Sequence, residues 1–364
     1  MKLIHIADMH LLMQPEKELP IGKERAAELS DTFARIIDIC NTEDVDLLLI
    51  AGDLFHMQPR QKDLKELAYR FGQLLRTKVV LIAGNHDYAG ARSNYPAFAR
   101  ENGWLPDSPD RSDAVTMLLD DSMGHVTFPE LKTTVYGLSY HTRDVKEAVY
   151  DAERPLGSGI NILLAHGGDS KNAPMNFDRI AANGWDYVAL GHIHKPQMIT
   201  KTMAYSGSPE PLDRNETGPH GYMSVEITEV SGSNETVASF VPFSKREYRD
   251  ITVPCTADMT QAELCDRLSE IIAKQGEQNM YRIFLTGCRA AEMTFDVSAI
   301  RRLGTITEVL DMTRPEYDLE RLRADNADNL VGMFIDALKD RGEFDEVAQK
   351  ALDYGLSALL GDRR

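Results

Sequence analysis

Short apolar runs recur along the first part of the chain, and each one ends abruptly in polar residues. The runs span residues 3–7, 47–51, 79–83, 160–165 and 187–190. Apolar stretches of this length that are bounded by Gly, Asp and Asn are typical of buried β-strands and too short for most helices. We therefore predict core strands at these positions, with the polar residues in the loops that follow them.

Two longer segments between these strands carry apolar side chains at helical spacing. They span residues 24–40 and 61–75, and each has one apolar and one polar face. The apolar positions are Leu29, Phe33, Ile36 and Ile37 in the first segment and Leu64, Leu67, Phe71 and Leu74 in the second. Strands that alternate with helices predict an α/β core with parallel strand pairing.

The remaining pattern up to residue 243 predicts a second sheet. Its expected strands are residues 115–119, 125–128 and 133–139, followed further along by 222–227 and 237–241. Residues 88–112 are rich in Pro, Asn, Asp and Ser, so we expect an irregular loop that shapes a substrate groove. Two sheets with helices outside them predict a four-layer αββα sandwich over residues 1–243.

The pattern changes after residue 243, where shorter strands and helices alternate. We expect strands at residues 248–253, 281–287 and 305–310 and helices at 261–274 and 297–303. These elements predict a small α+β domain over residues 244–315.

The end of the chain, residues 316–364, predicts a helical pair. The two helices are expected at residues 318–339 and 343–360, joined near Arg341 and Gly342. Their apolar stripes are Leu330, Phe334 and Leu338 on the first helix and Phe344, Val347, Ala351 and Tyr354 on the second.

The composition, with 43% hydrophobic and 27% charged residues, is that of a soluble globular protein. No stretch has the length of a membrane span, and only five residues separate Lys2 from Asp8, which is too short for a signal sequence. The four cysteines lack paired spacing and indicate reduced thiols. We therefore expect a cytoplasmic protein without a membrane anchor.

The loops after the core strands carry the candidate chemistry. Their motifs are Asp8-Met9-His10, Gly52-Asp53, Gly84-Asn85-His86-Asp87, His166-Gly167-Gly168 and Gly191-His192-Ile193-His194. Taken singly, Gly-Asp and Gly-Asn are ordinary turn residues, but here they occur together, each after a strand. Residues two apart on extended backbone point the same way, so Asp8 and His10 can hold one ion or two neighbouring ions. Carboxylate, imidazole and amide ligands suit manganese, iron or zinc, and the motifs predict a two-metal site.

The order of these motifs resembles the calcineurin-like metallophosphoesterase family. A finer match is to the SbcD/YhaO-type DNA repair exonucleases, the nuclease subunits of double-strand-break repair complexes. Longer sequence motifs carry this match, namely GDLF at residues 52–55, ALGHIHKPQ at 189–197 and YSGSP at 205–209. The resemblance implies the same sandwich fold and two divalent metal ions, with manganese as the leading choice and iron, zinc or magnesium as alternatives.

The resemblance also implies a role for each motif residue. One ion would be held by Asp8, His10, Asp53 and His194, and the other by Asp53, Asn85, His166 and His192, with Asp53 as the bridge. His86 would face the phosphate and stabilise charge or protonate the leaving oxygen, oriented by Asp87. His56 occupies a position where these nucleases carry His or Asp, and it would hold the substrate phosphate or nucleotide. The other histidines that we considered, His5, His125, His141 and His220, are read as structural or surface residues.

Taken as a whole, the resemblance implies a two-metal phosphodiesterase that cleaves DNA in double-strand-break repair, as an exonuclease or an endonuclease. A hydroxide that bridges the metals would attack phosphorus. Two alternatives stay open. One is a metallophosphatase or phosphodiesterase for a small-molecule or protein substrate, because the same set of metal ligands serves phosphate monoesters and phosphate diesters. The other is a non-catalytic adaptor of an ATPase complex.

The expected partners are DNA and an SbcC-like coiled-coil ABC-type ATPase, with a homodimer expected by analogy. The net charge of −17 is unusual for a protein that binds DNA alone, because neutralising phosphates drives such binding. We infer that tight DNA binding needs the partner. Residues 244–315 would be a capping domain beside the site, with dimerisation or stability as the competing role. The helical pair would dock onto the coiled coil or, equally, pack against the capping domain.

Overall fold

The computed structural model describes residues 1–339 and 346–361. Within the chain there are two compact units, Met1–Tyr248 and Arg249–Arg364. Lys245 belongs to the first unit by its contacts, because its backbone amide donates to Glu210 Oε1 at 2.8 Å. The contacts divide the chain after Tyr248, and the domain boundaries at residues 243 and 315 stay predictions.

Two six-stranded sheets form the frame of the first unit. The first sheet has the order β12 (Ser233–Pro242), β11 (Gly221–Val230), β1 (Lys2–Ile6), β2 (Leu47–Ala51), β3 (Lys78–Ile82) and β4 (Val115–Met117). The second has the order β5 (Gly124–Phe128), β6 (Thr133–Gly137), β7 (Ile160–His166), β8 (Tyr187–Gly191), β10 (Met203–Tyr205) and β9 (Gln197–Thr200). A short 3-10 helix, Pro129–Leu131, joins β5 to β6.

Parallel pairing brings the motif loops to one edge of each sheet. β1, β2 and β3 are parallel neighbours in the first sheet, and β7 and β8 are parallel neighbours in the second. These strands confirm the predicted core strands, and each one leads into its motif. β2 is buried along its whole length, which explains why its sequence LLLIA is uniformly apolar, whereas β5 alternates buried and exposed residues.

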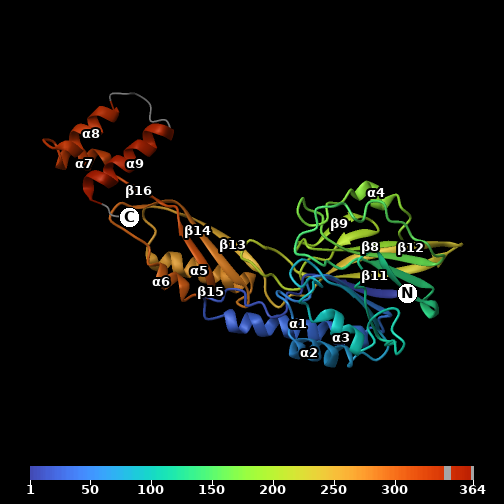
Figure 1. Ribbon diagram of the computed structural model, residues 1–364. Coiled ribbons are helices and arrows are strands. Elements are labelled where there is room, and N and C mark those ends of the chain that lie inside the picture. Colours follow the sequence, from blue (N-terminus) through green and yellow to red (C-terminus); the bar gives the residue numbers. More distant parts are fainter. Residues whose placement is uncertain (340–345, 362–364) are drawn as a thin grey trace. The chain divides into compact units, whose positions relative to one another are not determined.

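Three apolar clusters lie between successive layers of secondary structure, so the unit is the predicted four-layer sandwich (Figure 1). α1 (Gly22–Thr42), α2 (Gln61–Phe71) and α3 (Tyr95–Glu101) cover the outer face of the first sheet. Between the sheets, Leu49 of β2 packs in one cluster with Leu164 of β7. The outer face of the second sheet is covered by loops and the short helix α4 (Phe177–Ala181), so this layer is the thinner one.

Several local predictions are wrong. β11 and β12 were expected in the second sheet, but they lie in the first, where β11 pairs with both β1 and β12. β4 was also expected in the second sheet, but it pairs with β3 at the edge of the first, with Val79 opposite Val115. Its three residues are all buried, and a pattern this short fits either sheet equally well. α3 lies inside the predicted irregular loop. It buries Tyr95 and Phe98, and its seven residues are too few for a helical period to stand out.

The second unit contains a small α+β core, as expected from residues 244–315. Its elements are β13 (Tyr248–Cys255), α5 (Gln261–Gln275), β14 (Met280–Ala290), α6 (Val297–Arg301), β15 (Thr305–Asp311) and β16 (Arg314–Glu316). The N-cap residue of α5 is Thr260, which forms a capping box with Glu263. One face of α5, including Leu264 and Leu268, packs against Ile283 of β14.

Three helices follow, α7 (Leu319–Asp325), α8 (Leu330–Lys339) and α9 (Glu346–Leu360). The single helix expected at 318–339 is wrong, because the Asn329 side chain accepts from the Val331 amide at 2.9 Å and starts a new helix. The buried face is formed by Val331, Ile335, Leu338, Leu352 and Leu356. Much of the predicted stripes is instead exposed, namely Leu330, Val347, Ala351 and Tyr354. The expected turn at Arg341 and Gly342, with Phe344, lies outside the described residues. No described helix is long and apolar enough to cross a membrane.

Candidate metal centre

The loops after β1, β2 and β8 have unusual backbone conformations. Asp8, His10, Asp53 and His192 have φ values of 53°, 45°, 51° and 97°. Non-glycine residues adopt positive φ rarely, and such residues concentrate at functional sites. Backbone hydrogen bonds tie the first two loops together, since Asp8 N donates to Gly52 O and His10 N to Asp53 O, both at 3.1 Å. These bonds hold both aspartates in the same small region.

Glycine is required where the loops approach closely. A Cβ atom at Gly84 would overlap the Asp53 carboxylate, and one at Gly191 would overlap the carbonyl oxygen of Ala51. Gly84 therefore lets two loops of the first sheet approach each other, and Gly191 lets the second sheet approach the first. The strand ends of both sheets contribute side chains to one site.

The first predicted ligand set converges around His10. Its Nε2 lies 3.2 Å from Nε2 of His194 and 3.7 Å from Oδ2 of Asp53. Oδ1 of Asp8 lies 3.9 Å from Nε2 of His194. Two imidazole nitrogens that face each other at 3.2 Å need a proton or a cation between their lone pairs.

The second predicted set converges around Asn85. Its Oδ1 lies 3.0 Å from Nε2 of His166 and 3.2 Å from Nδ1 of His192. Oδ2 of Asp53 is 3.5 Å from Nε2 of His166. The same oxygen of Asp53 thus faces both sets, as expected for a bridging ligand. The structure brings all the predicted ligands together.

Burial and neighbouring charges shift the pKa values of these groups. Burial raises the pKa of Asp8. Burial acts on Asp53 in the same sense, but His166 and His10 outweigh it and hold the pKa of that carboxyl below its usual range. Burial lowers the pKa of His10 well below its usual value, so its ring is neutral and offers a lone pair. A mixed carboxylate, imidazole and amide set of this kind suits manganese, iron or zinc.

His86 lies beside the first set. Its backbone amide donates to Oδ1 of Asp53 at 2.8 Å, and its ring Nδ1 lies 3.1 Å from the carbonyl oxygen of His56. The rings of His86 and His10 have centroids 4.8 Å apart. The ring of His56 stacks on His86, and its Nδ1 lies 3.2 Å from Nδ1 of His10. His56 and His86 therefore flank the same ligand.

Comparison with known proteins agrees with this geometry. A family model described as calcineurin-like phosphoesterase matches residues 1–196. The chain belongs to the calcineurin-like phosphoesterase family. It is similar to the "uncharacterized metallophosphoesterase YhaO" of Bacillus subtilis, at 26% identity over 93% of this chain and 77% of the relative. It is also similar to the "DNA double-strand break repair protein Mre11" of Methanopyrus kandleri, at 25% identity over 90% of this chain and 84% of the relative.

As a member of this phosphoesterase family, the protein is a hydrolase of phosphate esters, and the family uses divalent metals. Three groups of side chains in the described residues could hold an ion, namely His10, His56 and His86; Asp8, His10 and His194; and Asp8, Asp53 and His166.

Asp87 links the loops beside the candidate metal centre. Its buried carboxylate accepts hydrogen bonds from Gly84 N at 2.8 Å, Phe55 N at 3.1 Å and the Tyr95 hydroxyl at 2.8 Å. Burial raises the pKa of Asp87 to about 7. The ring Nδ1 of His86 lies 3.1 Å from the carbonyl oxygen of His56, and the orientation of this ring by Asp87 stays a prediction. Asp87 fixes the two loops that carry His56 and His86.

Sequence reasoning missed two carboxylates that contact the ligand histidines. Asp169 Oδ2 lies 2.8 Å from Nε2 of His192, and Glu216 Oε1 lies 2.6 Å from Nδ1 of His194. Asp169 directly follows the His-Gly-Gly motif, so its position was a usable signal. Glu216 is far from every motif in sequence, and nothing local marks it.

Two of the remaining histidines, His5 and His220, are buried and lie within hydrogen-bonding distance of hydroxyl groups. His5 is fully buried, and its Nδ1 contacts the Tyr187 hydroxyl at 2.9 Å. Nδ1 of His220 lies 3.0 Å from the Ser208 hydroxyl, and both side chains are buried.

Proposed function

We propose that this protein is a two-metal phosphodiesterase that cleaves DNA. The observation that carries the proposal is the shared Oδ2 of Asp53, which faces two ligand sets at once and has the His86 ring beside it. The double-strand break repair protein of Methanopyrus kandleri, aligned over 90% of this chain, supports DNA as the substrate.

The proposed ligands are Asp8, His10, Asp53 and His194 for one ion and Asp53, Asn85, His166 and His192 for the other. When bound, two divalent ions, manganese by preference, supply an activated water and neutralise charge on the phosphate. His86 is proposed to act on the ester. Its Nδ1–H donates to the His56 carbonyl, so the protonated ring has Nε2–H available for the leaving oxygen. His56 is proposed to contact the substrate phosphate from the same side.

The proposed complex includes an SbcC-like coiled-coil ABC-type ATPase and a homodimer, and we place it in the cytoplasm with the DNA. The net charge of −17 supports a need for help in DNA binding. The C-terminal helices leave apolar side chains exposed that suit a coiled-coil partner, namely Leu330, Met333, Val347 and Tyr354. Residues 244–315 are proposed as the capping domain.

The first test is the manganese-dependent release of nucleotides from linear double-stranded DNA. Wild type, His86→Ala and the control His125→Ala are compared, and His125 is an exposed histidine outside the site. We expect His86→Ala to lose at least a hundredfold in rate, on the order of a general-acid contribution, while it keeps its metals. His125→Ala should match wild type.

The same acidic surface favours one second candidate, a phosphodiesterase or phosphatase for a small-molecule or protein substrate. A bis(p-nitrophenyl) phosphate assay run in parallel separates the two. If the reporter is hydrolysed and DNA stays intact even with the ATPase partner present, the second candidate replaces the first.

A further inference from the structure

His192 and His194 present opposite ring nitrogens to the metal centre, although they stand only two residues apart. His192 directs Nδ1 toward Asn85, at 3.2 Å, and its Nε2 toward Asp169, at 2.8 Å. His194 directs Nε2 toward His10, at 3.2 Å, and its Nδ1 toward Glu216, at 2.6 Å. A neutral imidazole has one proton, so a carboxylate at one nitrogen keeps the proton there and leaves a lone pair at the other.

We propose that Glu216 and Asp169 are positioning residues, each serving a different half of the metal centre. Glu216 fixes the ring and tautomer of His194 for the ion held with Asp8 and His10. Asp169 does the same for His192 and the ion held with Asn85. The inference rests on the proposed two-metal function and adds that the two ions depend on separate outer carboxylates.

Glu216 is itself held in place on its far side. Its Oε2 accepts a hydrogen bond from Leu212 N at 2.7 Å. The carbonyl of neighbouring Pro211 accepts from the fully buried Arg25 at 2.8 Å, and Arg25 also pairs with Glu210 at 3.3 Å. A carboxylate with a fixed backbone anchor loses little freedom when it orients a ligand, which is the usual design around metal-bound histidines.

Asp169 is anchored by its own loop. Its Oδ1 accepts from Lys171 N at 2.7 Å and from Asn172 N at 2.9 Å. Its Oδ2 accepts from Asn172 Nδ2 at 3.2 Å and lies 2.8 Å from Nε2 of His192. The side chain of Asp169 is 45% exposed, against 19% for Glu216. Water screens the more exposed pair more strongly, so we expect the larger effect at Glu216.

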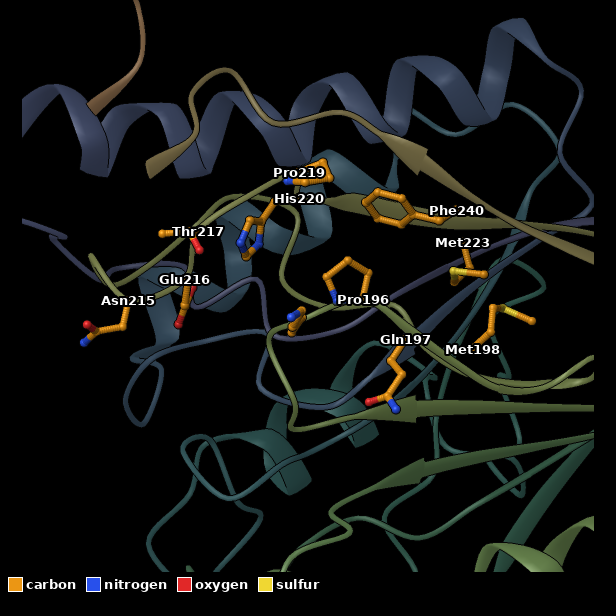
Figure 2. A pocket seen from close by; sticks show the side chains of 11 residues that line it. Pro196, Gln197, Met198, Asn215, Glu216, Thr217, Pro219, His220, Met223 and Phe240 are labelled. Atoms are coloured by element: carbon orange, nitrogen blue, oxygen red, sulfur yellow. The ribbon is translucent and has the colours of Figure 1, made fainter. Parts of the chain in front are cut away.

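A cavity of about 430 Å³ lies against Glu216. Its walls include Pro196, Met223 and Phe240, and Figure 2 shows Glu216 at its edge beside Thr217 and His220. Truncation of Glu216 to alanine adds space next to an existing cavity, so a small carboxylate such as acetate can reach Nδ1 of His194. Chemical rescue is therefore available as a test, and a merely structural defect would not respond to it.

The experiment is a manganese titration followed by calorimetry and electron paramagnetic resonance, which requires no DNA cleavage. Wild type should bind two ions. In Glu216→Ala one of the two affinities should fall by about tenfold to a hundredfold, and Asp169→Ala should weaken the other ion by a smaller factor. Acetate should restore the lost affinity in Glu216→Ala and leave wild type unchanged. If Glu216→Ala is poorly folded, Glu216→Gln takes its place and should show a smaller loss of the same ion.

A double-mutant cycle gives the matched control. Removing Glu216 in a His194→Ala background should have no further effect on manganese binding, whereas removing it in a His192→Ala background should add to the loss. Equal weakening of both ions by either variant, or full retention of both, overturns the inference and leaves the two-metal function standing. Wild type that binds fewer than two ions overturns the proposed function itself and the inference with it.

Discussion

The backbone amide of His86 and the carboxylate of Asp53 are joined by a 2.8 Å hydrogen bond through Oδ1. The other oxygen of this carboxylate, Oδ2, lies 3.7 Å from Nε2 of His10 and 3.5 Å from Nε2 of His166. One side chain thus places the proposed acid and faces both ligand sets. The position of His86 relative to the phosphate is consequently tied to the position of the ions.

Replacing Asp53 should separate its two proposed roles. One is the hydrogen bond to the loop that carries His86, and the other is the bridging of the two metals. Asp53→Asn keeps an oxygen for the His86 amide but removes the bridging charge. We expect phosphodiester hydrolysis to fall about a thousandfold or more, because metal-assisted charge stabilisation contributes several kcal/mol. The measurements are the steady-state rate of bis(p-nitrophenyl) phosphate hydrolysis and the metal content of the purified variant. Asp113→Asn, in an exposed loop, is the control, and a variant at position 53 with wild-type rate and two ions would contradict the bridge.

Metal removal should lower the stability of the first unit. Ions that bind only the folded state stabilise it by about 2.7 kcal/mol at a free concentration one hundred times the Kd. Both tryptophans, Trp104 and Trp185, lie in this unit, so their fluorescence follows its unfolding. We expect chelation to lower the denaturation midpoint of wild type and to leave Asp53→Asn almost unchanged. An equal drop in both proteins would show that the ions act elsewhere.

The buried hydroxyl of Tyr95 should contribute to stability through Asp87. It donates at 2.8 Å to a carboxylate that is fully buried. Tyr95→Phe removes one of the two donors to Oδ2 of that carboxylate and leaves the Phe55 amide as the other. We expect a loss of about 1–3 kcal/mol in the free energy of unfolding. Tyr69→Phe, at a side chain that is 66% exposed, should change it by less than about 0.5 kcal/mol. Equal effects of the two substitutions would contradict this account.

Acidification should destabilise the protein through His5. Burial lowers the pKa of His5 to about 3, whereas the unfolded chain has the ordinary value of 6.5. Between these values the unfolded state binds the additional proton, so stability is complete above pH 6.5 and falls as the pH drops toward 3, by at most about 1.4 kcal/mol per pH unit.

The measurement is the free energy of unfolding at several pH values for wild type, His5→Gln and the exposed-site control His125→Gln. His5→Gln should show a shallower decline between pH 6.5 and 5 than the other two proteins. Parallel pH profiles for all three would remove His5 as the cause.

The sequence was most informative where chemistry and local structure coincide. Apolar runs such as 47–51 could be identified as strands because strands buried on both faces need uniformly apolar residues. The residues after them could be identified as ligands because parallel strands end at one edge. The outer partners could not be found in this way. Glu216 contacts His194 only through the folding of a distant loop. Which sheet β4 joins depends on which sheet has an unpaired edge strand near it.

Tertiary packing also decides which face of the helices at the end of the chain is buried. The pattern of α8 offers two overlapping apolar faces, and packing against Leu352 and Leu356 selects the one with Val331 and Ile335. Periodicity alone cannot choose between them.

The candidate metal centre draws Asp8, Asp53 and Asn85 from the first sheet and His166 and His192 from the second. Ions bound there would link the two sheets of the sandwich to each other. Any slip of one sheet against the other pulls ligands apart, so the register between the sheets and the occupancy of the site would be lost together. A chain cut between β6 and β7 should therefore reassemble far more readily with manganese than without it.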